Sequence, residues 1–144
     1  MSDLNKYRFR HVMQVRYSDM DMLGHANNAV YLTYLELGRL AYFEEVSGRR
    51  WKDIALVLAH ASLDYKVPLT PGIEPVVHIR TTPFGNTSLT MENVITDAAG
   101  ERTFFVASTV LVAINPKTGK PVPIPDEEKQ KVIDYEPALA SSEQ

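Results

Sequence analysis

The stretch "YSDMDMLGHANNAVYLTYLELGRLAYF" spans residues 17–43 and changes character near its middle. Up to residue 28 it is polar and rich in residues that favour turns. Beyond that point apolar residues recur at helical spacing, which predicts a helix over residues 28–46 with Gly48 as its left-handed stop. One apolar stripe holds Val30, Tyr34, Leu37 and Ala41, and the stripe beside it holds Tyr31, Leu35, Tyr42 and Val46. Because this apolar arc is wider than the roughly 100° that one contact covers, other elements must wrap around the helix.

Strand patterns lie on both sides of this helix. Residues 8–17 alternate, which predicts a half-buried strand with Phe9, Met13, Val15 and Tyr17 on one face. After residue 51 we predict four strands, at 56–67, 75–82, 88–96 and 102–114, joined by short turns. A short helix over 126–135 and a frayed tail over 136–144 complete the chain. The pattern indicates an α+β fold with one antiparallel sheet curled around the helix, in a single domain over residues 1–135.

Composition narrows the chemistry that the chain can perform. Its 144 residues fit one globular domain, and its formal charge of −3 argues against a nucleic-acid-binding protein. With no cysteine, the chain has no disulfide, no thiolate nucleophile and no cysteine metal site. The first residues do not resemble a signal peptide, and no run of about 18 apolar residues occurs. We therefore expect a soluble, cytoplasmic protein that does not insert into membranes.

The polar residues just before the helix have three interpretations. They can form an ordinary turn in which Asn27 or Asn28 caps the helix. They can form a site, because Asp21 and His25 lie beside a helix N-terminus whose free N–H groups suit an oxygen that becomes negative. A metal site made by Asp19, Asp21 and His25 is disfavoured, since no second cluster of histidine or glutamate offers the remaining ligands.

The same stretch resembles a known family pattern, aromatic-x-D-x-D-x-x-G-H-x-N-N-x-x-Y. This pattern joins the first strand to the central helix in hotdog-fold acyl-CoA thioesterases of the 4-hydroxybenzoyl-CoA thioesterase type. "AHASLDYKVPLTPG" is similar to the second strand of that family, and "AAGERTFFVASTVLVAINPKTGKPVPIPDE" to its last hairpin and exit loop. The resemblance covers residues 8–128 and implies a hotdog fold that hydrolyses acyl-CoA thioesters.

The resemblance also implies roles for single residues. It places the catalytic carboxylate on Asp21 and makes Asp19 a structural turn residue. It implies that the backbone N–H of Asn28 polarises the thioester carbonyl. His25 and Tyr31 would line the acyl pocket or position the carbonyl.

Other residues of the expected site have weaker support. Gly24 and Asn27 belong to the same motif and are expected to contribute to substrate binding. Some relatives carry a catalytic glutamate on the central helix, so Glu36 is an alternative, although its position favours exposure to solvent or to a dimer partner. His60 lies on the strand face opposite Leu63. It either faces a partner subunit's site or, as we favour, is a hydrogen-bonded structural histidine.

The expected chemistry leaves two routes open. Asp21 either attacks the carbonyl directly or acts as a general base on a water molecule. Neither route calls for a metal or a cofactor, and coenzyme A enters as part of the substrate. The alternatives are a non-catalytic acyl-CoA-binding module, a thioesterase acting on acyl-carrier protein, and an enoyl-thioester hydratase, whose Asp/His spacing differs. A homodimer or tetramer is expected, because one small sheet leaves helix surface and sheet edges uncovered.

Overall fold

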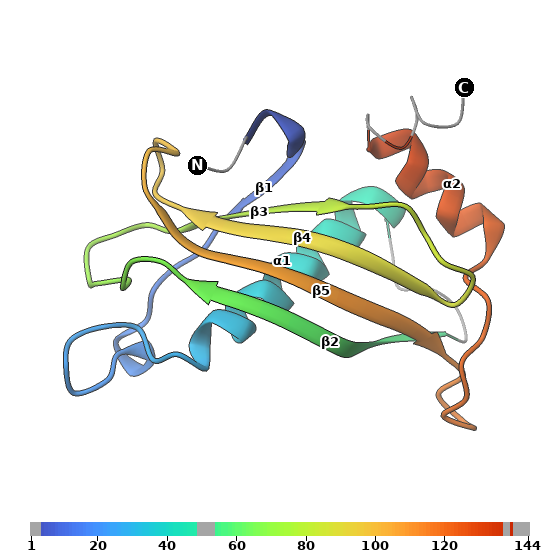
Figure 1. Cartoon of the computed structure of the whole chain (residues 1–144), viewed down its shortest axis with the longest axis horizontal. Helices are drawn as coiled ribbons and strands as arrows, with labels where there is room; N and C mark the ends of the chain where they lie inside the picture. The colour runs from blue at the N-terminus through green and yellow to red at the C-terminus, as the bar shows by residue number, and fades with distance from the viewer. Residues whose placement is uncertain (1–3, 49–53, 137–138, 140–144) are drawn as a thin grey trace.

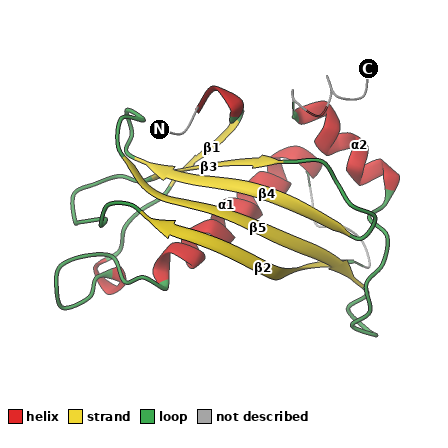
Figure 2. Ribbon diagram, viewed as in Figure 1, coloured by secondary structure: helices red, strands yellow, loops and turns green. Residues whose placement is uncertain are grey.

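A computed structural model describes residues 4–48, 54–136 and 139 of the chain. Five antiparallel strands form one sheet in the order β1-β3-β4-β5-β2, and a long helix lies across one face of it (Figures 1 and 2). The elements are η1 (Leu4–Lys6), β1 (Phe9–Val12), η2 (Tyr17–Asp19), α1 (Val30–Ser47), β2 (Ala55–Tyr65), β3 (Val76–Thr81), β4 (Ser88–Thr96), β5 (Thr103–Ile114) and α2 (Asp126–Tyr135). This arrangement confirms the predicted α+β hotdog architecture.

Helix α1 packs closely on the inner face of the sheet. A Cβ atom at Gly38 would lie 3.0 Å from Ile79 Cδ1 and 3.1 Å from Val77 Cγ1, so glycine lets the helix backbone approach β3. The core between helix and sheet is apolar and includes Tyr34, Leu35, Tyr42, Met91, Ile95, Phe105 and Leu111. On the opposite side of the helix Leu37 and Leu40 remain 46% and 57% exposed. The sheet therefore covers only part of this apolar helix.

The first strand is shorter than the predicted 8–17. It pairs with β3 from Phe9 to Val12, and one further bond joins Met13 N to the Pro75 carbonyl at 2.8 Å. The chain then turns into η2, where Tyr17 is 98% exposed instead of facing the core. The alternation of apolar and polar residues in the sequence therefore extends beyond Val12, the last residue of β1 that pairs with β3.

Both ends of α1 refine the prediction. The helix begins at Val30 instead of residue 28, and neither Asn27 nor Asn28 is its N-cap, because that position is Ala29, with no side-chain cap bond. At the other end Gly48 has φ of 77°, so the predicted left-handed stop is confirmed.

A β-bulge changes which residues of β2 share a face. The pairing with β5 shifts between Leu58 and His60. As a result Leu58 lies on the face of Ala61, whereas Val57, predicted to be there, lies on the other face. Beyond the bulge the predicted alternation holds, and His60 lies on the face opposite Leu63.

The C-terminal region is anchored by a buried carboxylate. Glu136 is 2% exposed, and its Oε2 accepts hydrogen bonds from the Tyr42 hydroxyl at 2.6 Å and from Thr81 N at 2.7 Å. Burial raises the pKa of Glu136, and these hydrogen bonds only partly oppose that effect. Leu139 is also buried, so these two members of the predicted frayed tail are packed against the fold. The other residues of 137–144 lie outside the described residues.

Within the described residues, no helix has both the length and the apolar character needed to cross a membrane.

Candidate active site

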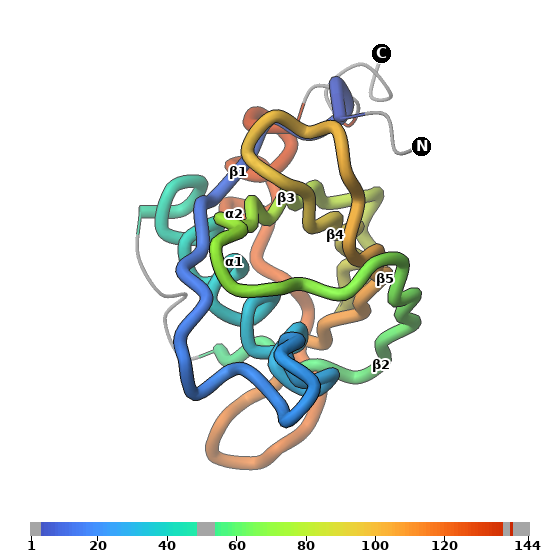
Figure 3. Tube along the Cα trace, turned by 90° about the vertical axis from the view of Figure 1, so that its left-hand side faces the viewer, coloured from blue at the N-terminus to red at the C-terminus, as the bar shows by residue number. Residues whose placement is uncertain are grey.

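Five of the predicted site residues lie in the loop between η2 and α1: Asp21, Gly24, His25, Asn27 and Asn28. This loop is at the same end of the molecule as the connection from β2 to β3 (Figures 1 and 3). A bridge between Met20 and Ala26 closes it, and Asp21 N donates to the His25 carbonyl at 2.8 Å. Gly24, with φ of 76°, supplies the left-handed backbone that this tight turn requires.

The carboxylate of Asp21 is held by one of its two oxygens. Oδ1 accepts hydrogen bonds from Leu23 N at 2.9 Å and from His25 N at 3.3 Å. This local pattern is typical of aspartate in turns. Within the described part of the chain, Oδ2 has no hydrogen-bond partner, so one oxygen fixes the side chain and the other is free to react.

Asp19, two residues earlier, has a different environment. It is 1% exposed and accepts hydrogen bonds from Arg16 N and from the Tyr34 hydroxyl, each at 2.8 Å. The guanidinium of Arg16 also contacts its Oδ1 at 2.8 Å. Burial alone would raise the pKa of Asp19, but the bonds from Arg16 and Tyr34 together lower it. Asp19 is therefore a structural carboxylate, as the resemblance implied.

The backbone at Asn28 presents a free donor just before the helix. The Asn27 carbonyl accepts from Val30 N at 2.9 Å, so the N–H of the same peptide unit, that of Asn28, points the opposite way. No acceptor among residues 4–48, 54–136 and 139 bonds to this N–H. Together with the positive end of the α1 dipole, it is a suitable donor for a carbonyl oxygen that gains negative charge.

A pocket of about 410 Å³ collects these groups. Its lining residues are Asp21, Leu23, His25, Ala26, Asn28, Tyr31, Tyr65, Lys66, Val67 and Pro68. Four of the predicted site residues therefore line one cavity: Asp21, His25, Asn28 and Tyr31. Gly24 and Asn27 shape the loop but are not in the lining, and His60 is exposed on β2 outside it.

The opposite wall of this pocket comes from the segment that leaves β2. Tyr31 packs against Phe105 with ring centroids 4.9 Å apart, and its hydroxyl accepts from Leu69 N at 3.1 Å. Ala26 N donates to the Leu69 carbonyl at 2.8 Å. Tyr65 and Pro68 were not singled out from the sequence. The sequence feature that could have identified them is the alternation of apolar residues along β2, which ends at Tyr65, three residues before Pro68.

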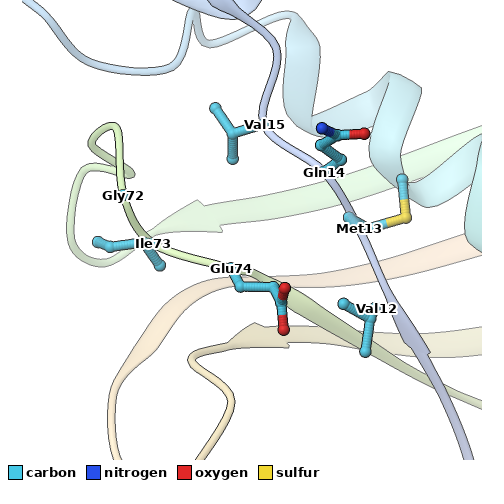
Figure 4. Close-up of a pocket in the computed structure, with 7 residues that line it drawn as sticks. All are labelled: Val12, Met13, Gln14, Val15, Gly72, Ile73 and Glu74. Atoms are coloured by element: carbon cyan, nitrogen blue, oxygen red, sulfur yellow. The ribbon is translucent and has the colours of Figure 1, made fainter.

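A second cavity of about 440 Å³ lies where β1 and the chain before β3 diverge (Figure 4). It is lined by Val12, Met13, Gln14, Val15, Gly72, Ile73 and Glu74. Among the described residues that line it, the exposed Glu74 is the one with an ionisable side chain, and no base or cluster of donors accompanies it there. The chemistry therefore converges at the Asp21 pocket and not at this cavity.

Neither the metal interpretation nor Glu36 gains support from the geometry. Among the described residues no three histidine, cysteine, aspartate or glutamate side chains are grouped to hold a metal. The carboxylate of Asp19 is already used by Arg16 and Tyr34, so it does not converge with Asp21 and His25. Glu36 is exposed on α1 and is not in the pocket lining.

A long helix wrapped by one antiparallel sheet is the hotdog architecture that the sequence predicted. The model of the thioesterase-like superfamily matches residues 15–132. The chain belongs to this superfamily, and the resemblance seen in its sequence is confirmed.

Similarity to individual proteins extends over most of the chain. The uncharacterized protein YsmA of Bacillus subtilis (strain 168) is 30% identical over 128 residues, which are 88% of this chain and 86% of YsmA. A thioesterase from Thermus thermophilus, solved in complex with coenzyme A and Zn, is 34% identical with a TM-score of 0.78, covering 91% of this chain and 96% of that one. A predicted thioesterase from Bacillus stearothermophilus is 29% identical with a TM-score of 0.78, covering 88% and 95%.

Proposed function

We propose that this protein is an acyl-CoA thioesterase that converts a thioester and water into a carboxylic acid and free coenzyme A. The observation that carries the proposal is that one pocket contains two groups without a hydrogen-bond partner among the described residues, Oδ2 of Asp21 and the N–H of Asn28. The coenzyme A bound by the 34% identical Thermus thioesterase supports the choice of substrate.

In the proposed reaction the thioester carbonyl oxygen accepts a hydrogen bond from the Asn28 N–H. This donor stabilises the negative charge that develops on the oxygen as the carbonyl carbon is attacked. In the nucleophilic route Oδ2 of Asp21 bonds to that carbon, the C–S bond breaks, and the thiolate of coenzyme A leaves. Water then hydrolyses the mixed anhydride and regenerates the carboxylate.

In the general-base route the same oxygen removes a proton from a water molecule as that water attacks the carbonyl carbon. The tetrahedral intermediate collapses with loss of the thiolate, which receives a proton, and Asp21 returns to its ionised state. Both routes need the Oδ1 anchor, since it fixes the orientation of the carboxylate and so of Oδ2.

The remaining site residues take supporting roles in this proposal. His25 and Tyr31 line the pocket and would contact the acyl group or the carbonyl. Gly24 and Asn27 would act through the shape of the loop. His60, exposed on the edge strand, would meet substrate only in a neighbouring subunit's site, within a homodimer or tetramer.

We also infer that the domain over residues 1–135 acts without a metal or a cofactor. In support, the Asp19 carboxylate is taken up by Arg16 and Tyr34 and is not available as a metal ligand.

A thiol-release assay tests the proposed function. Coenzyme A release would be followed across short, long, branched and aromatic acyl-CoAs, with acyl-carrier-protein thioesters in parallel. Turnover of at least one acyl-CoA is expected. Activity with carrier-protein thioesters alone would move the substrate to that class. Tight acyl-CoA binding without release would favour a binding module.

A further inference from the structure

We infer that Tyr65 is a positioning residue, whose hydroxyl orients the backbone donor that polarises the thioester carbonyl. The inference rests on the proposed function and assigns a task to a residue that the catalytic motif does not contain.

The geometry begins with one hydrogen bond across the pocket. Tyr65 ends β2, and its hydroxyl donates to the Asn28 carbonyl at 2.8 Å. These residues are 37 positions apart, so the contact ties the sheet to the turn before α1. The N–H of the same residue, Asn28, is the proposed donor to the substrate.

The peptide unit between Asn28 and Ala29 is held at both ends. Tyr65 donates to its carbonyl oxygen, and its N–H donates to Oδ1 of Asn27 at 2.9 Å. The preceding peptide unit carries the free Asn28 N–H, and its carbonyl accepts from Val30 N at 2.9 Å. Because peptide units are planar, fixing these two units leaves little freedom for the direction of the Asn28 N–H.

The ring of Tyr65 is 46% exposed, and its inner part is held by two ring contacts. It packs edge-on against Tyr31 with centroids 5.2 Å apart and an interplanar angle of 85°. It also contacts Phe105, again at 5.2 Å, and Phe105 is fully buried. Since Tyr31 and Phe105 stack on each other, the three rings form one rigid cluster. These ring contacts limit the positions that the Tyr65 hydroxyl can take.

Ala26 N donates to the Leu69 carbonyl and Asn27 N to the Asp19 carbonyl, each at 2.8 Å, so the turn is anchored just before Asn28. Apart from the bond from Tyr65, the peptide unit between Asn28 and Ala29 is held, among the described residues, only by its neighbour Asn27, so it can still tilt. A shift of the donor by about 1 Å is enough to weaken a transition-state hydrogen bond severely. Removing a whole oxyanion donor lowers kcat by roughly 10²- to 10³-fold. Loss of the Tyr65 hydroxyl, which leaves the donor present but less well aimed, should lower kcat by about 10-fold.

The test compares Tyr65→Phe with the wild-type protein on the best acyl-CoA substrate. Tyr65→Phe keeps the ring cluster, so its melting temperature should stay close to that of the wild type. We expect kcat to fall about 10-fold with little change in KM, because the interaction strengthens in the transition state. Tyr17→Phe is the matched control: Tyr17 is 98% exposed, and this change should leave both constants unaltered.

A spectroscopic measurement separates positioning from a general structural role. The probe is a ketone analogue of benzoyl-CoA, in which a methylene group separates sulfur from a ¹³C-labelled carbonyl. Bound to wild-type protein, its infrared carbonyl stretch should move to lower frequency than in water, and at saturation this shift should be smaller in Tyr65→Phe. If Tyr65→Phe does not fold, Asn27→Ala tests the other end of the same peptide unit, with the same decrease in shift expected.

The outcomes are distinguishable. A wild-type protein that neither hydrolyses acyl-CoAs nor binds the ketone analogue would overturn the proposed function, and the role of Tyr65 with it. An active wild type with unchanged kcat and unchanged carbonyl shift in Tyr65→Phe would overturn only the positioning role. A lower kcat with an unchanged shift would also overturn it, because the donor would then be correctly aimed.

Discussion

Tyr34 donates a 2.8 Å hydrogen bond to Oδ2 of Asp19, so the first aspartate of the D-x-D pair is tied to the central helix. The second, Asp21, is exposed and keeps its Oδ2 free in the described structure. Two neighbouring carboxylates thus have separate tasks, one in holding the loop on the helix and one available for chemistry.

Asp19→Asn is therefore expected to act on stability. The substitution weakens a buried, charge-assisted set of hydrogen bonds from Arg16 and Tyr34, and we expect the free energy of unfolding to fall by about 2 kcal/mol. Because the pKa of Asp19 is lowered in the folded state, its stabilisation is present above the ordinary value of about 3.9 and is lost as pH falls. Denaturant unfolding should show the two proteins converging below about pH 4. The exposed Asp64→Asn is the control, and an equal effect there would contradict the assignment.

Glu136 predicts a pH dependence of the opposite sign. Burial raises its pKa, so the folded state binds its proton more tightly than the unfolded state does. Stability from this group is then highest at low pH and falls as pH rises from about 4.3 through the folded pKa. Glu136→Gln can still accept from Tyr42 and Thr81 N but has no charge to bury. The difference in melting temperature between Glu136→Gln and the wild type should therefore increase in favour of the variant from pH 4.5 to pH 8. For Glu101→Gln, at an exposed site, this difference should stay constant. A parallel curve for Glu136→Gln would refute this assignment.

The exposed edge of the sheet predicts an oligomer. Strand β2 is an 11-residue edge strand on which Val57 and Leu58 are 39% and 43% exposed. Such an edge invites pairing with another chain. Sedimentation velocity at micromolar concentration should detect no stable wild-type monomer, and Leu58→Asp should release monomers.

The helix face offers a second test of assembly. Leu40→Asp changes an exposed apolar residue on α1, and it should split a tetramer into dimers without releasing monomers. A wild-type protein that is folded, soluble and monomeric would contradict both expectations and the shared-site role of His60.

Thioester hydrolysis is expected to proceed without an added metal. Prolonged dialysis against a strong chelator, checked by metal analysis, should leave kcat unchanged. Activity that is lost and then restored by zinc or magnesium would point to Asp21 and His25 as metal ligands after all.

Much of the fold follows from periodicity. The apolar stripe that contains Tyr31, Leu35 and Tyr42 and the near-continuous apolar run of β5 are governed by burial, which the sequence displays directly. In the neighbouring stripe Leu37 is 46% exposed. The end of β1 and the bulge in β2 are not encoded in alternation, because alternation does not specify where pairing stops or where a residue is inserted. Burial of Glu136 also depends on partners distant in sequence, Tyr42 and Thr81.

The site was predictable where its residues are contiguous. Asp21, His25, Asn28 and Tyr31 occupy a single motif and line a single pocket. Tyr65 and the residues after it, up to Pro68, reach the pocket from the end of β2. Their position depends on how the sheet packs around the helix. Because Tyr65 is 37 positions from Asn28, no local sequence pattern indicates that the two residues meet.

The central claim is that Oδ2 of Asp21 attacks the thioester or activates the attacking water. Asp21→Asn keeps the size of the side chain and an oxygen for Leu23 N, but it removes the basic oxygen. The most direct measurement is turnover of this variant on the best acyl-CoA, with Glu36→Gln as the matched carboxylate control and thermal unfolding alongside. We expect folded Asp21→Asn with kcat lowered by roughly 10²- to 10⁴-fold and KM little changed. A folded variant that turns over within a few-fold of wild type would contradict this mechanism.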